Sequence, residues 1–319
     1  MPKISILVPC YNVEKYIRQC LDSVVNQTLT DIEIICINDG SKDSTLDILR
    51  EYESKDNRIK VISKHNSGYG ASMNIGLETA IGDYIGIVES DDLVELNMFE
   101  KLYNTAKDND LDLVRCQYYL YKSSDNSNEL FDNTWVPMNK VYCPLDNNTP
   151  FMQAPAIWCN LIKRNILIDN NIRFLETPGA SYQDTSFAFK LYATSKRFMM
   201  ISDVFMHYRT DNENSSVNSI KKMDCVLTEY AEIKRFAKEH NVYDKLKFLI
   251  PKIRYSCYRW NHERLVRKLK FPFLLKMSKE YLADFLQGNI DKNLFTKKEY
   301  KRIFIISFFP WLYMFRKGL

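Results

Sequence analysis

Residues 83–92 read DYIGIVESDD, an apolar run that ends in three closely spaced carboxylates. A short apolar run of this kind predicts a buried strand. Three earlier runs are similar, and each is followed by a segment with helical spacing: KISILVP at 3–9, IEIICI at 32–37 and KVI at 60–62. This alternation predicts an α/β fold with a mostly parallel sheet covered on both faces by helices.

Later segments continue the pattern less regularly. We predict a helix near 95–108, a strand near 111–121, a helical segment at 156–169, a helix at 184–196 and a strand at 198–206. Residues 123–150 are rich in Asn, Asp, Ser and Pro, which is typical of a surface excursion. From residue 221 onward the pattern is helical and basic, which predicts two domains, 1–220 and 221–319.

In open parallel sheets, ligands bind beyond the carboxyl ends of the strands. The segments that follow the predicted strands are far more polar than the strands themselves: PCYN (9–12), NDGS (38–41), KHN (64–66) and ESDD (89–92). We therefore expect the functional site at this edge of the sheet.

The acidic segment suggests a metal site. Glu89 and Asp91 flank Ser90, and in an extended segment residues two apart point the same way. Carboxylates so placed suit Mn²⁺ or Mg²⁺, which would bridge the phosphates of a nucleotide diphosphate. A solvated acidic loop would contain the same residues and stays an alternative. Asp92 is expected to cap the following helix.

Three further residues are candidates for contact with a nucleotide sugar. Asp39 ends the second strand and can accept a hydrogen bond from a base or ribose, and Tyr11 can stack on a base. Asn74 lies in SGYGASMNIG (67–76), a helix start that suits a phosphate or sugar but lacks the glycine spacing of a dinucleotide-binding loop. Helix capping, core packing and a helix-surface position are the respective structural alternatives.

The order of these segments resembles glycosyltransferase family 2, whose enzymes have the GT-A fold. The resemblance is carried by ISILVPCYNVEKYIRQCLDSVVNQT (4–28), IEIICINDGSKDST (32–45) and NSGYGASMNIGLETAIGDYIGIVESDD (66–92). It is close over residues 4–92 and looser to about residue 220. Three positions depart from the family pattern: Asn38, Met73 and Glu89, where the family has Asp, Arg and Asp.

The resemblance implies a set of donor-binding and metal-binding residues. Asp91 would be the principal metal ligand, and Glu89 stands where the family has the first Asp of its D-x-D motif. The uridine part of the donor would be held by Pro9, Tyr11 and Asp39, with Ser90 and Asn74 as further donor contacts. His207 lies where many GT-A enzymes have a histidine ligand, so a metal or phosphate role is a further hypothesis.

The resemblance also implies a catalytic base. Asp184 follows Gln183, which stands where the family has Glu, and matches the base position. In an inverting transfer, one carboxylate takes the proton of the acceptor hydroxyl while that oxygen attacks the anomeric carbon. Considered without the resemblance, Asp184 is better explained as a helix cap.

Charge is unevenly distributed along the chain. Residues 221–319 contain 23 Lys and Arg against 10 Asp and Glu, a net charge of +13, which leaves −9 for residues 1–220. An acidic domain that binds a nucleotide diphosphate needs a divalent cation between the two.

The eight cysteines are scattered without a C-x-x-C pair, and no export signal is visible, so we expect buried free thiols and a cytoplasmic location.

The last 18 residues read RIFIISFFPWLYMFRKGL. Residues 303–315 are almost wholly apolar, too short to cross a bilayer and bounded by basic residues. They suit an interfacial position on anionic lipid at the inner face of the cell membrane, near a lipid-linked acceptor. The alternative is a C-terminal helix that packs on the catalytic domain.

These observations predict a metal-dependent enzyme that acts on a nucleotide sugar. The resemblance implies an inverting transfer of a hexosyl or N-acetylhexosaminyl group from a UDP-sugar to a saccharide hydroxyl, during assembly of a bacterial capsule, lipopolysaccharide or glycoconjugate. One alternative is a sugar-nucleotide nucleotidyltransferase, although residues 9–12 lack the glycine-rich basic loop of such enzymes. Another is a non-catalytic nucleotide-sugar-binding module, suggested by Asn38, Glu89 and Gln183. Nucleic acid is not an expected partner because no recognition motif is present.

Overall fold

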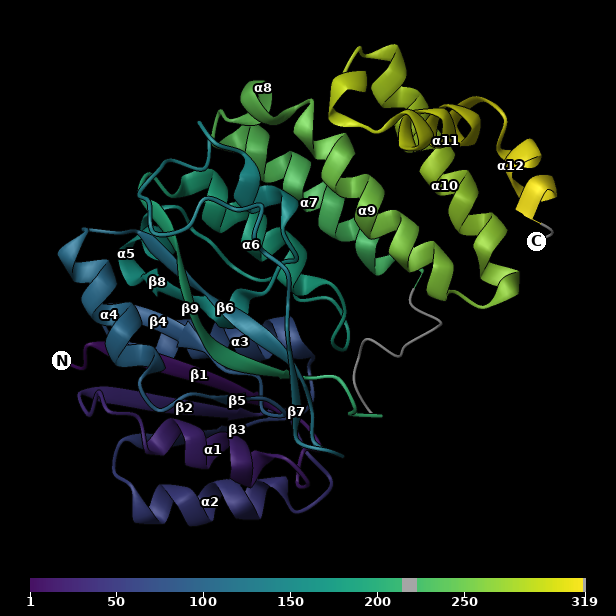
Figure 1. Ribbon diagram of the computed structural model, residues 1–319. Helices are drawn as coiled ribbons and strands as arrows, with labels where there is room; N and C mark the ends of the chain where they lie inside the picture. The colour runs from purple at the N-terminus through teal and green to yellow at the C-terminus, as the bar shows by residue number, and fades with distance from the viewer. Residues whose placement is uncertain (214–222, 318–319) are drawn as a thin grey trace. The chain divides into compact units, whose positions relative to one another are not determined.

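The computed structural model describes residues 1–213 and 223–317 (Figure 1). The chain divides into two compact units, Met1–Asn214 and Ser215–Leu319. The predicted boundary at residue 220 lies outside the described residues.

The first part of the first unit confirms the predicted alternation of strands and helices. Its strands are parallel and ordered β3-β2-β1-β4 in the sheet. They are β1 (Ile4–Cys10), β2 (Ile32–Asn38), β3 (Ile59–Ser63) and β4 (Tyr84–Ile87). The helices between them are α1 (Ile17–Val25), α2 (Thr45–Lys55) and α3 (Tyr69–Thr79). Every residue of β1 and β4 is buried, as expected of strands covered on both faces.

Alternate residues of β1 face different helices. Ile4, Ile6 and Val8 belong to the core cluster that also contains the apolar face of α1. Leu7 points to the other face, where α3 packs so closely that a Cβ on Gly76 would lie 3.2 Å from a methyl group of Leu7. Helices therefore cover this part of the sheet on both faces.

The second half of the sheet is mixed, so the predicted mostly parallel order holds only for the first four strands. The sheet continues β4-β8-β6-β9-β5, with β7 paired to β6. Only β6 and β9 are parallel to each other in this half. The strands are β5 (Leu93–Val94), β6 (Leu113–Lys122), β7 (Ser127–Leu130), β8 (Asn160–Lys163) and β9 (Phe198–Arg209).

The helical segment predicted at 156–169 is wrong in its first half. Residues Ile157–Cys159 form a 3₁₀ turn, Asn160–Lys163 form β8, and only α5 (Arg164–Asp169) is helical. The four residues of β8 are too few to show the periodicity of a helix or a strand. Their antiparallel pairing with both β4 and β6 decides their conformation. The remaining elements of this unit are α4 (Met98–Asp108), α6 (Gln183–Thr194) and the 3₁₀ turn η1 (Thr149–Met152).

The second unit is helical, as predicted. Its elements are α7 (Cys225–Glu239), α8 (Tyr243–Leu246), α9 (Leu249–Arg264), α10 (Arg267–Leu286), the 3₁₀ turn η4 (Lys292–Leu294), α11 (Lys297–Phe308) and α12 (Pro310–Lys317). Its interior holds a buried ion pair between Arg254 and Asp284, flanked by the rings of Tyr258 and Tyr281. No helix among the described residues has the length and apolar character that a bilayer crossing requires. All eight cysteines are described, and all are free.

Candidate active site

The loops that follow β1 and β2 are joined by hydrogen bonds. The backbone N–H of Asn12 donates to Ser41 Oγ at 3.0 Å, and Asn12 Oδ1 accepts from Lys42 N at 2.8 Å. Val13 N donates to Thr45 Oγ1 at 2.9 Å. These bonds define a fixed rim at the carboxyl ends of the strands, on which the side chain of Tyr11 is 46% exposed. The predicted stacking of a base on Tyr11 stays a prediction.

Pro9 is buried at the point where β1 and β4 separate. Pairing of these strands stops at Leu7, whose carbonyl accepts from Val88 N at 3.0 Å. Residues two apart in a strand direct their backbone groups to the same side. The position where Pro9 lacks an N–H group therefore faces the side of β4. There the chain has already turned away into residues 89–92, so the proline costs no hydrogen bond between β1 and β4.

Asp39 holds the loop that begins α3. Its carboxylate accepts from the backbone N–H groups of Ser67 and Gly68, both at 2.9 Å, and forms an ion pair with Lys64. Gly68 has φ +95, and a Cβ there would lie 3.0 Å from the backbone of Thr177 and Gly179, so this position requires glycine. The predicted contact of Asp39 with uridine is untested, and its side chain already has three donors.

Glu89, Asp91 and Asp184 form one carboxylate cluster. Burial raises the pKa of Glu89 to about 8, and the charges of Asp91 and Asp184 add to the effect. The hydroxyl of Tyr69 donates to Glu89 Oε1 at 2.7 Å, which opposes that rise in pKa. Burial also raises the pKa of Asp184 to about 6. Carboxylates from two distant segments thus lie near enough to one another to interact electrostatically.

Asp91 and Asp92 are held by the end of β9 and the residues after it. Asn212 Nδ2 donates to Asp91 Oδ2 at 2.7 Å, and Arg209 Nε donates to the carbonyl of Asp91 at 2.6 Å. The backbone N–H of Arg209 donates to Asp92 Oδ1 at 2.7 Å. The guanidinium of Arg209 lies 4.9 Å from the centre of the Tyr16 ring.

The roles of Arg209, Asn212 and Tyr69 were not predicted from the sequence. The only available signal was that Arg209 and Asn212 follow the last predicted strand. The prediction that Asp92 caps a helix is wrong, since Asp92 is buried and the next helix, α4, has Asn97 at its N-cap. The two-residue strand β5 lies between them and was not visible in the sequence.

Asn74 and Gln183 organise the segment that leads to Asp184. The amide nitrogen of Asn74 donates to the carbonyl of Phe174 at 3.0 Å and to Glu176 Oε1 at 2.9 Å, while its oxygen accepts from Phe174 N at 2.9 Å. The amide group of Asn74 thus binds the chain itself, a role different from the donor contact that the sequence suggested.

Gln183 explains one departure from the family pattern. Its Nε2 donates to Thr177 Oγ1 at 2.9 Å and to the carbonyl of Gly179 at 3.0 Å, and its Oε1 accepts from Ser181 N. A glutamate could not donate to these oxygens when ionised. Asp184 follows in the first turn of α6, whose N-cap residue is Tyr182, so Asp184 is not the N-cap.

His207 does not join the carboxylate cluster. Its Nδ1 lies 2.8 Å from Asn128 Oδ1, and its Nε2 lies 2.8 Å from Glu95 Oε1. Both ring nitrogens therefore have partners in the chain. This geometry does not support the hypothesis that His207 is a metal ligand, because the pairing of β9 with β5 directs the side chain toward Glu95.

The cluster fits an open metal site. In the described ranges 1–213 and 223–317, no group of three or more His, Cys, Asp or Glu side chains is arranged to enclose an ion. A divalent cation bound together with phosphates needs only one or two protein carboxylates. Asp91 uses Oδ2 for Asn212, which leaves Oδ1 for such an ion. Burial is the main cause of the raised pKa of Glu89, and a cation would relieve the repulsion from Asp91 and Asp184 that adds to it.

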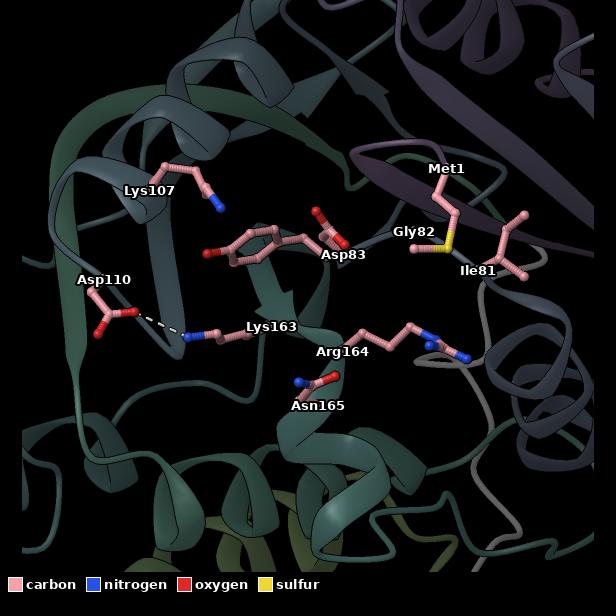
Figure 2. Close-up of a pocket in the computed structure, with 10 residues that line it drawn as sticks. Met1, Ile81, Gly82, Asp83, Lys107, Asp110, Lys163, Arg164 and Asn165 are labelled. Carbon is pink, nitrogen blue, oxygen red and sulfur yellow. Dashed lines mark hydrogen bonds and ion pairs between the residues drawn. The ribbon is translucent and has the colours of Figure 1, made fainter.

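A cavity of about 350 Å³ lies at the opposite ends of the strands (Figure 2). It is lined at the start of β4 by Gly82, Asp83 and Tyr84, and Figure 2 shows Lys163 paired with Asp110 at its edge. Glu89 follows the other end of β4. The cavity is therefore separate from the carboxylate cluster.

Comparison with known proteins places this geometry in a family. The sequence model described as glycosyl transferase family 2 matches residues 5–168, about half of the chain. The chain belongs to glycosyltransferase family 2. EpsJ of Bacillus subtilis, an uncharacterized glycosyltransferase, is 36% identical over 231 residues, which cover 67% of this chain and 63% of EpsJ. The poly(ribitol-phosphate) beta-glucosyltransferase of Bacillus spizizenii is 34% identical over 67% of this chain and 34% of its own length. This family 2 chain thus spans less than two thirds of either relative.

Solved structures confirm the GT-A-type fold of this family 2 chain. The structure of Staphylococcus aureus TarS 1–349 with UDP superposes with a TM-score of 0.73 at 19% identity, covering 99% of this chain and 92% of that one. The mannosyltransferase PcManGT of Pyrobaculum calidifontis, with GDP-Man and Mn²⁺, gives a TM-score of 0.52 at 14% identity, covering 96% and 84%. At these identities the similarity shows the fold alone.

Proposed function

We propose that this protein is an inverting glycosyltransferase that moves a sugar from a UDP-sugar to a saccharide hydroxyl. The observation that carries the proposal is the convergence of Asp184 with Glu89 and Asp91 in one cluster at the carboxyl ends of the strands. A reaction of this kind needs a base on the acceptor side and negative groups that hold a cation on the donor side. The cluster contains residues for both.

Asp184 is the proposed base. A catalytic base works best when its pKa is near the working pH, and burial raises the pKa of Asp184 to about 6. At pH 7 the carboxylate is mostly ionised and yet more basic than an exposed aspartate. It would take the proton of the acceptor hydroxyl as that oxygen attacks the anomeric carbon.

Asp91 and Glu89 are the residues that would hold a divalent cation. The ion, when bound, neutralises charge on the departing diphosphate. Tyr69 and Asn212 orient these carboxylates through the hydrogen bonds described above. Support for a metal also comes from the Mn²⁺ in the PcManGT structure.

The comparisons support UDP as the nucleotide and a hydroxyl group as the acceptor. TarS, which has the same fold, was solved with UDP, and one relative is named as a glucosyltransferase that acts on poly(ribitol-phosphate). The exposed ring of Tyr11 and the rim at residues 11–13 are available to a base. We place the reaction in the cytoplasm, at the inner face of the membrane, during assembly of a bacterial surface glycan.

The two rival functions differ in their support. The family match counts against a sugar-nucleotide nucleotidyltransferase. A non-catalytic binding module would bind UDP without any need for Asp184. Replacing this residue therefore distinguishes a glycosyltransferase from such a module.

The test compares Asp184→Asn with Asp91→Ala. Purified protein is titrated calorimetrically with UDP, with Mn²⁺ or with chelator, and a panel of UDP-sugars is screened for transfer and hydrolysis. We expect Asp184→Asn to bind UDP as the wild type does and to lose turnover, and Asp91→Ala to lose the Mn²⁺-dependent part of UDP binding. Wild-type turnover by Asp184→Asn would refute the base, and UDP binding indifferent to Mn²⁺ would refute the metal site.

A further inference from the structure

The second unit exposes a set of large apolar side chains near its C-terminus. Trp311 is 69% exposed and Leu286 is 79% exposed, fractions that are high for residues of their size. We define the apolar surface by its exposed members: Leu286, Phe304, Phe308, Phe309, Trp311 and Leu312. They come from the end of α10, from α11, from α12 and from Phe309, the residue between the last two helices (Figure 1).

Ring contacts link α10 to both α11 and α12. The centre of the Phe285 ring lies 6.0 Å from that of Phe304 and 5.5 Å from that of Phe308, and the latter two rings are 4.8 Å apart. Nearer the start of α10, the centres of the Phe271 and Trp311 rings are 4.4 Å apart. Large apolar side chains gathered on the exposed surface of a folded protein are typical of an interaction site.

Helix α11 places cations on the same face as these rings. Lys297, Lys301, Phe304 and Phe308 are spaced at i, i+4, i+7 and i+11, which is one exposed stripe of a helix. Its opposite side buries Ile303 and Ile306 against the unit. The helix is therefore already packed on one side, and the stripe is the side left to solvent.

The lysines of α11 have no anionic partner in the described part of the chain. Lys297, Lys298 and Lys301 are exposed and form no ion pair there. Between residues 267 and 317 the sequence has 12 Lys and Arg against 4 Asp and Glu. Three of those four acids are paired with cations, Glu280 and Asp284 with Arg254 and Glu299 with Lys252.

We propose that the apolar surface and the lysines of α11 bind a membrane containing anionic phospholipid. Aromatic and aliphatic side chains would enter the interface between headgroups and acyl chains, while the lysines contact lipid phosphates. A second copy of this chain fits less well because a symmetric contact would bring like charges together. This surface lies within the second unit, and its binding to lipid is independent of the reaction at Asp184.

Sedimentation with vesicles tests the proposal on the full chain without any sugar nucleotide. Vesicles of phosphatidylcholine are compared with vesicles that contain one third phosphatidylglycerol, at low salt and at 0.5 M salt. Wild-type protein should sediment with the anionic vesicles at low salt, with weaker binding at high salt. Since each lysine near such a surface strengthens binding about fivefold, replacing Lys297, Lys298 and Lys301 by Glu should weaken it about a hundredfold or more.

Matched variants separate this surface from general charge and exposure. Lys60, Lys101 and Lys196 are exposed lysines of the first unit, and their replacement by Glu makes the same change in net charge. Phe304→Ser with Trp311→Ser removes exposed rings of the surface, and Trp135→Ser removes a ring that is 50% exposed in the first unit. Only the variants of the second unit should lose vesicle binding.

Hydrogen–deuterium exchange on the wild type adds a measurement that needs no variant. Amides of α11 and α12 should become protected on anionic vesicles and not on neutral ones.

The proposal is overturned if wild-type protein binds vesicles equally with and without phosphatidylglycerol, or if the control variants lose vesicle binding to the same degree. It is also overturned if light scattering shows a dimer that Phe304→Ser with Trp311→Ser converts to monomers, which would assign the surface to a second copy. Because no transfer is measured, failure here leaves the proposed reaction untouched.

Discussion

Replacement of Tyr69 by Phe is the sharpest test of how the carboxylate cluster works. The change removes one hydroxyl, the donor to Glu89 Oε1 at 2.7 Å, and keeps the ring that meets Phe174 edge-on at 5.8 Å. The backbone N–H of Tyr69 still donates to the carbonyl of Gly179 at 3.1 Å. The perturbation is therefore confined to the hydrogen bond that stabilises the ionised form of Glu89.

The expected size follows from the charge on the acceptor. A hydrogen bond to a charged group contributes about 1.5–3 kcal/mol, and a partly buried one is near the upper end. Without it the pKa of Glu89 should rise further above about 8, so less of the ionised carboxylate is available to a cation at pH 7. We expect Mn²⁺-dependent binding of UDP to weaken by about tenfold to a hundredfold, and less so at pH 9.

The assay is calorimetric titration with UDP at pH 7 and pH 9, in Mn²⁺ and in chelator. Tyr52→Phe is the matched control, because the hydroxyl of Tyr52 donates to Asp22 Oδ1 at 2.6 Å on the surface between α1 and α2. That variant should bind UDP as the wild type does. If Tyr69→Phe also binds UDP with wild-type affinity at both pH values, Tyr69 does not position Glu89 and the reasoning fails.

Three further predictions concern the same site. Asp184→Asn should lower the transfer rate about 10³-fold, and the wild-type rate should fall below about pH 6 as the base is protonated, measured as a pH profile of kcat. Because the pKa of Glu89 is raised from 4.5 to about 8, the folded metal-free protein binds this proton more tightly than the unfolded chain, so stability is lost as pH rises through that range. Glu89→Gln should then raise the melting temperature in chelator at pH 9 and leave it unchanged at pH 4.5; a lower value at pH 9 would contradict this. Gln183→Glu should destabilise the protein by about 1–3 kcal/mol in urea unfolding, since a carboxylate would face the carbonyl of Gly179.

Much of the polar edge of the sheet could be predicted because it depends on local patterns. The apolar runs at 4–10, 32–38 and 84–87 are strands, and the carboxyl ends of parallel neighbours meet at one edge whatever the details of packing. That rule alone brought Tyr11, Asp39 and Glu89 to the same rim. Asp184 required the family resemblance, because nothing in its own surroundings distinguishes a base from a residue at a helix start.

The site predictions that the observed contacts do not support concern residues whose partners lie far along the chain. His207 was a candidate ligand because many GT-A enzymes have a histidine ligand at this place, yet the pairing of β9 with β5 sets it beside Glu95, 112 residues earlier. Asn74 appeared suited to a donor sugar, yet its amide binds Phe174, 100 residues later. An amide or imidazole can bind many partners, so its residue type does not say which one the fold supplies.

The sequence by itself determined that the first four apolar runs are strands, which end of the sheet carries the polar residues, and where the acidic and basic parts of the chain divide. Only the tertiary structure decided that β8 enters the sheet antiparallel between β4 and β6, and that Tyr69 and Asn212 orient Glu89 and Asp91. The physical reason is the distance along the chain over which each kind of information extends. Periodicity records how one segment faces the core, whereas partner choice depends on backbone groups and side chains that meet only after the chain has folded.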